Sequence, residues 1–172
     1  MDAAADARVA IASAIDRLTT AQARTEALAE LHTPRRIGPF RRAPRLVPVG
    51  EVWRLGVLLL AADPIGGERL FATGSVTRAR DPRHPNFTSV SGEERRELRE
   101  AARRAGFAAG ETVNFEATAL PLDDTLGCVG PVVLRDDGLL VRWNALSPES
   151  LAPFDAYLRE RVELLAAPPA GS

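Results

Sequence analysis

The sequence contains no lysine, so all 22 of its basic residues are arginine. A chain without lysine cannot form a Schiff base, use a Walker A lysine or build a Ser-Lys dyad. Cysteine occurs once, at Cys128, which excludes an internal disulfide and makes the cytoplasm the expected compartment. Its two histidines, its single cysteine and its acids show no metal-ligand spacing, and no glycine-rich phosphate loop follows a strand. We therefore expect no metal and no cofactor.

Long hydrophobic runs are also missing. No stretch approaches the roughly 20 apolar residues that a membrane-spanning helix needs, and the acidic N-terminus lacks the basic start of a secretory signal. The formal net charge of −1 gives no global attraction to nucleic acid or to an anionic membrane. The expected partner is therefore a protein or a small molecule.

The composition is that of an ordinary globular chain. With 172 residues, 45% hydrophobic and 26% charged, it fits one domain over residues 1–172. Within it we expect three parts: an N-terminal helical segment over residues 1–33, a Pro/Arg-rich arm over 34–48 and an α+β core over 49–172. In the first part, the helix itself should run from Ala3 to about Leu31.

The core alternates strands with two helices. Strands are predicted over 51–63, 68–80 and from Thr112 to Leu120, and a hairpin over 131–143. A charged helix, capped at Ser91 and ended by Gly106, follows the second strand, and a last helix covers 153–166. The order α-β-β-α-β-β-β-α predicts an α+β fold in which helices cover an antiparallel sheet of about five strands. Acids and arginines nearly cancel on the charged helix, which predicts a solvated face rather than a phosphate-binding surface.

Two glycines mark a possible ligand site. A hairpin centred on Ile65 pairs residues whose numbers sum to 130, which places Gly56 opposite Gly74. Facing glycines leave a notch in a sheet, where another group approaches closely. We expect side-chain or helix packing to fill this notch, with Trp53 and Trp143 as candidate rings. A ligand is the alternative.

The arm carries the strongest local charge. It interleaves Ile37 and Phe40 with arginines, of which we single out Arg35, Arg36, Arg41 and Arg42. These arginines either pair with acids of the same chain, which we favour, or bind an anion or nucleic acid.

Several phrases are similar to a known group of proteins. The stretches "RLVPVGEVWRLGVLLL", "RLFATGSVTRAR", "GETVNF" and "LAPFDAYLRERVELL" resemble short, arginine-rich bacterial proteins labelled glutaminase, over roughly residues 45–166. The resemblance implies amide hydrolysis of glutamine, although no active-site motif is matched. An amidotransferase-type mechanism needs a cysteine, a histidine and an acid, for which Cys128, His84 and Asp123 are the candidates.

The residues themselves favour a different function. Nothing near Cys128 in the sequence would stabilise a thiolate, so we expect a buried, unreactive cysteine. His84 is expected to be an exposed loop residue. The preferred interpretation is a cytoplasmic α+β protein that binds a protein or small ligand without catalysis. The alternatives are a glutaminase-like amide hydrolase and an anion or nucleic-acid binder that uses the arm.

Overall fold

The computed structural model describes residues 2–33, 43–80, 90–135 and 138–167. Within them the chain forms three helices and ten strands, and it divides into two compact units. Unit 1 comprises residues 1–25, 52–73 and 118–172, and unit 2 comprises 26–51 and 74–117. The α+β class is confirmed. No helix in the described part of the chain combines the length and apolar character needed to cross a membrane.

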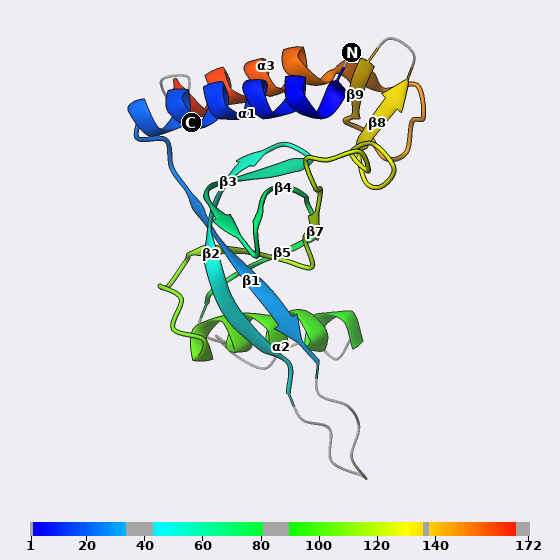
Figure 1. Ribbon diagram of the computed structural model, residues 1–172. Helices are drawn as coiled ribbons and strands as arrows, with labels where there is room; N and C mark the ends of the chain where they lie inside the picture. Colours follow the sequence, from blue (N-terminus) through cyan, green and yellow to red (C-terminus); the bar gives the residue numbers. More distant parts are fainter. Residues whose placement is uncertain (1, 34–42, 81–89, 136–137, 168–172) are drawn as a thin grey trace. The chain divides into compact units, whose positions relative to one another are not determined.

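Unit 1 is built around two helices that lie side by side, α1 (Ala3–Thr20) and α3 (Phe154–Ala166) (Figure 1). They pack on the end of β2 (Arg45–Leu55), on β3 (Leu58–Ile65) and on β4 (Glu68–Ala72), and β7 (Thr118–Ala119) pairs with β4. A separate three-stranded sheet consists of β8 (Val132–Arg135), β9 (Gly138–Arg142) and β10 (Leu151–Pro153), in the order β10-β9-β8. Leu18, Leu58, Leu60 and Leu158 are among the most buried side chains of this core.

Unit 2 holds β1 (Glu26–His32), the beginning of β2, β5 (Ser75–Arg78), β6 (Thr112–Phe115) and α2 (Val90–Arg104). β6 pairs parallel with β1 and antiparallel with β5. Ala101 and Ala102 of α2 pack with Val113 and Phe115 of β6, so α2 covers one face of these strands. Small alanines on the helix allow its backbone to approach the sheet closely.

The main sheet differs from the predicted one. Its strand order is β5-β6-β1-β2-β3-β4-β7, so it has seven strands rather than about five. The parallel β1–β6 pair makes it mixed rather than antiparallel. The predicted order of helices and strands was wrong, because several segments predicted as one helix or strand form two separate elements in the structure.

The first helix is shorter than predicted. It ends at Thr20, and Gln22 adopts a positive φ of 50°, which an α-helix does not allow. Leu28 and Leu31 continue the helical spacing by coincidence and belong to β1. Of the predicted arm, residues 34–42 lie outside the described residues, while Arg45 to Pro48 begin β2.

The predicted strands break at turns. The strand over 51–63 is two strands, which pair from Leu55–Leu58 onward around a tight turn at Gly56. The strand over 68–80 divides into β4 and β5, and the strand from Thr112 to Leu120 divides at Glu116, whose φ is 56°. Hydrophobic alternation does not reveal such turns when apolar residues flank them.

Two further details need correction. Helix α2 begins at Val90, so Ser91 lies inside the helix and is not its cap. An Asp137-Gly138 turn in the predicted hairpin over 131–143 would place Val132 opposite Trp143 and Leu134 opposite Val141. In the structure Val132 faces Val141 and Leu134 faces Leu139, so this predicted register is wrong by two residues. Two predictions are confirmed: Gly106 ends α2 with a φ of 90°, and α3 occupies its predicted range. The predicted sum of 130 holds from Leu58–Ala72 to Leu60–Leu70 but fails at Ile65, which pairs with Glu68 and is not the centre of the turn.

Candidate interaction surface

Tyr157 occupies the space beside Gly56. Gly56 has a φ of 67°, and a Cβ placed on it would overlap the Tyr157 hydroxyl. That hydroxyl accepts a hydrogen bond from the Val57 N–H at 3.0 Å and donates one to the Leu55 carbonyl at 3.1 Å. Helix α3 therefore fills the predicted notch on this side, as expected from packing, and no ligand is needed to explain the glycine.

Gly74 and Trp53 also have structural roles. A Cβ on Gly74 would overlap the backbone carbonyl of Glu116, so close backbone approach explains this glycine. Trp53 is 4% exposed and donates its indole N–H to the Ala23 carbonyl at 3.1 Å. The two glycines thus have different neighbours, and packing accounts for both of them without a ligand.

The proposed catalytic residues are only partly described. Cys128 is exposed, so its predicted burial was wrong. Asp123 accepts hydrogen bonds from the Thr125 hydroxyl at 2.6 Å and the Thr125 N–H at 2.8 Å, which lower the pKa of its carboxyl. These bonds make Asp123 a turn-forming residue of its own loop. His84 lies outside the described residues, so whether it meets Cys128 stays an open prediction.

The arm arginines Arg35, Arg36, Arg41 and Arg42 likewise lie outside the described residues. Of the acids proposed as their partners, Glu26 and Glu30 lie on β1 rather than on the first helix. Glu26 accepts a hydrogen bond from the amide of Asn114 at 2.8 Å, and Glu30 lies 3.3 Å from the His32 ring. Anion binding by the arm remains a prediction.

Several exposed apolar side chains belong to the three-stranded sheet of unit 1 and its bordering loops. In the described part of the chain eight large apolar side chains are exposed, and half of them belong to this substructure. We call them the Trp143 surface: Val129, 55% exposed, Leu134, 51%, Trp143, 48%, and Leu146, 94%. Single exposed apolar residues are ordinary, whereas large exposed apolar patches are typical of interaction sites.

Backbone hydrogen bonds hold the loop that carries Trp143 and Leu146. The Trp143 N–H donates to the Ser150 carbonyl at 3.1 Å, which closes the loop. Inside it the Asn144 side chain accepts from the Leu146 N–H at 3.0 Å. Leu146 is thereby fixed in a tight turn with its side chain in water.

A buried platform supports this surface. Val132 of β8 and Val141 of β9 face each other and are almost fully buried in the core of unit 1. Gly127, with a φ of 94°, lies against the backbone of Leu134, so the loop that contains Cys128 borders β8. The surface residues therefore lie on β8 and on the loops that border β8 and β9, whose backbones are drawn in Figure 1.

Sequence reasoning singled out only one residue of this surface, and for another reason. Trp143 was a candidate for the glycine notch, whereas Val129, Leu134 and Leu146 were missed. The stretch "WNALSPES" contains the available signal, because a leucine stands among turn-forming residues where no core position is expected. The chain matches no protein-family model, no curated protein and no solved structure, so the argument for function rests on these residues.

Proposed function

We propose that the protein is a non-catalytic binding module that contacts another protein through the Trp143 surface. The observation that carries this proposal is the 94% exposure of Leu146 beside the half-exposed Trp143. Tryptophan is enriched among the residues that dominate binding energies, particularly where it is surrounded by other contacts that exclude water. Folding gains little from an apolar side chain left in water, so binding is the better explanation for Leu146.

The order of the loop favours the same function. An interface residue that is already fixed loses less conformational entropy on binding than one on a flexible loop. The hydrogen bonds from Trp143 to Ser150 and from Leu146 to Asn144 supply that order. Trp143 and Leu146 are therefore positioned before the partner arrives.

Photo-crosslinking in the native cell tests the proposal. A photoreactive amino acid replaces Leu146, and in a control protein it replaces Val9, which is 72% exposed on α1. We expect a discrete crosslinked protein from position 146 and none from position 9. Equal labelling from both positions, or no adduct from position 146, would contradict the proposed interface.

A second candidate function is amide hydrolysis of glutamine, and the exposure of the Cys128 thiol is the observation that favours it. An accessible thiol can reach a substrate, and the glycines on both sides of "GCVG" leave room for one. The test is ammonia release from glutamine by the purified protein and by Cys128→Ser. Release that is lost in Cys128→Ser would establish this function, and its absence in the native protein would exclude it.

A further inference from the structure

Charge is unevenly divided between the two units. By sequence, unit 2 carries 13 arginines and 10 acids, a formal charge of +3, whereas unit 1 carries 9 arginines and 13 acids, a charge of −4. The excess comes from residues outside the described part, because the described residues of unit 2 carry 8 arginines and 9 acids. A basic surface on them therefore depends on how the arginines are arranged, and such a local surface attracts anions even when the total charge does not. Within the described residues of unit 2, most of the arginines lie on α2.

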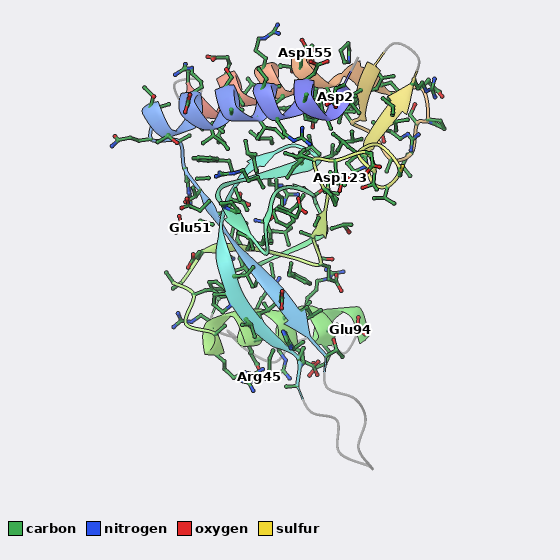
Figure 2. The ribbon with its side chains drawn as sticks, viewed as in Figure 1. Asp2, Arg45, Glu51, Glu94, Asp123 and Asp155 are labelled. Atoms are coloured by element: carbon green, nitrogen blue, oxygen red, sulfur yellow. The ribbon has the colours of Figure 1, made fainter. Side chains whose placement is uncertain are left out.

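Three arginines of α2 recur at helical spacing and form a row along one side of the helix. Arg95, Arg99 and Arg103 are each four residues apart, which places them about 6 Å apart along the axis and about 40° apart around it. Every acid of the helix lies about 100° or more around the axis from Arg99. Glu94, labelled in Figure 2, is about 140° away. Glu100 is closer to Arg103, about 60° away. The flank around Arg95 and Arg99 therefore has no acid of the same helix beside it, whereas the Arg103 end of the row does.

Ion pairs within the helix reinforce this separation. Glu93 and Glu100 are the acids nearest to the arginine row, and both pair with Arg96. Arg95 and Arg99 are exposed, and in the described part of the chain neither makes an ion pair. Arg103 donates to the Phe107 carbonyl at 3.2 Å, which anchors the end of the row. The buried face with Ala101 and Ala102 fixes the helix on its sheet.

We propose that this row, Arg95, Arg99 and Arg103, is a binding site for the phosphate backbone of a nucleic acid. Arginine matches phosphate oxygens with two parallel hydrogen bonds, and a row about 12 Å long spans roughly three to four phosphates of one strand. The described part of α2 has no aromatic side chain on which a base could stack. The contact is therefore to the backbone of a duplex and independent of base sequence. This site is separate from the Trp143 surface, and neither proposal rests on the other.

Binding of the full-length protein to a fluorescein-labelled DNA duplex, followed by anisotropy at several salt concentrations, tests the site. The test variant is Arg95→Gln/Arg99→Gln. The matched control is Arg24→Gln/Arg159→Gln, which removes the same charge from exposed positions of unit 1. A second control, Arg104→Gln, alters the opposite flank of the same helix. Circular dichroism verifies that each variant is folded.

We expect log K to fall with log salt with a slope of about −2 to −3, because each neutralised phosphate contributes about −0.9. In Arg95→Gln/Arg99→Gln the slope of log K against log salt should become less negative by about 2. The affinity at low salt should be about tenfold weaker. Both controls should stay within about twofold of the native affinity. No duplex binding by the native protein at about 50 mM salt, or equal losses in variant and control, would overturn the proposal. Stronger binding of fluorescein-labelled polyglutamate than of the duplex would also overturn it and point to an acidic protein.

Discussion

Tyr157 connects helix α3 to the turn between β2 and β3. Its hydroxyl bonds the backbone on both sides of Gly56, and the guanidinium of Arg161 lies 5.3 Å from the centre of its ring. The turn needs a positive φ, which glycine adopts without strain, and the ring needs the space that a side chain at position 56 would occupy. One glycine thus serves both the turn and the packing of the helix.

Gly56→Ala tests this double role. Backbone strain at a positive φ costs about 1–2 kcal/mol, and displacement of the Tyr157 hydroxyl adds to it, so we expect a loss of about 2–4 kcal/mol in the free energy of unfolding. Gly66→Ala is the matched control, because Gly66 has a φ of 61° and open space around it. That control should lose only about 1–2 kcal/mol. Equal losses in urea denaturation would show that contact with Tyr157 is unimportant.

Tyr157→Phe isolates the hydroxyl. It leaves the ring in place but removes both hydrogen bonds, so the Val57 N–H and the buried Leu55 carbonyl lose a partner. Unpaired buried polar groups cost about 1–3 kcal/mol, and we expect a loss in that range. A change below about 0.5 kcal/mol in urea denaturation would mean that water replaces the hydroxyl.

At the scale of whole elements, α1 and α3 are joined near their C-terminal ends by an ion pair. Both ends of the Arg17 guanidinium fork contact the Glu163 carboxylate at 2.9 Å. Asp2 caps the start of α1 and Asp155 lies in the first turn of α3, and the two lie at the same end of the helix pair (Figure 2). The hydrogen bond from Arg17 holds the pKa of Glu163 below its usual range.

This ion pair predicts a small dependence of stability on pH. Because the pKa of Glu163 is lower in the folded state, its contribution is fully present above the usual glutamate pKa and is lost as the pH falls through the folded value. In Arg17→Gln the Glu163 pKa, followed by NMR, should rise to the usual range. Arg24→Gln, which alters an exposed arginine of the same unit, should leave it unchanged. An unchanged Glu163 pKa in Arg17→Gln would refute the pairing in solution.

The elements also show how far the sequence could be interpreted. Helix α3 was predicted closely because Phe154, Leu158 and Val162 repeat at helical spacing after a proline and pack into the core. The first helix was extended too far because alanines favour a helix and nothing local marks its end before Gln22. The break between β6 and β7 at Glu116 could not be predicted, because glutamate seldom adopts the positive φ that it has there.

The candidate site was harder to predict than the fold. Hydrophobic patterns identify residues that become buried, but they do not tell which apolar residues remain in water. Cys128 was expected to be buried, whereas Leu126, two residues earlier, takes the core position. The separation of charge on α2 follows from spacing alone and was available from the sequence. It was missed because only the total charge was considered.

At the scale of the whole molecule, the account assigns each unit its own task. Unit 1 is acidic and presents the Trp143 surface, while unit 2 is basic and presents the arginine row. If both proposals hold, the two units have partners of different chemistry, a protein for unit 1 and the backbone of a nucleic acid for unit 2. The central claim is the Trp143 surface, because it contains Leu146, the most exposed large apolar side chain in the described part of the chain.

The most direct measurement is the affinity of the crosslinked partner, once purified, for Trp143→Ala and Leu146→Ser by isothermal titration calorimetry. Residues at the centre of an interface cost about 2 kcal/mol or more when truncated, so we predict at least about a 30-fold loss for Trp143→Ala. Val9→Ala and Leu164→Ala, at exposed helix positions of the same unit, are the controls and should stay within about twofold of the native affinity. Equal affinities of Trp143→Ala, Leu146→Ser and the native protein would contradict the account.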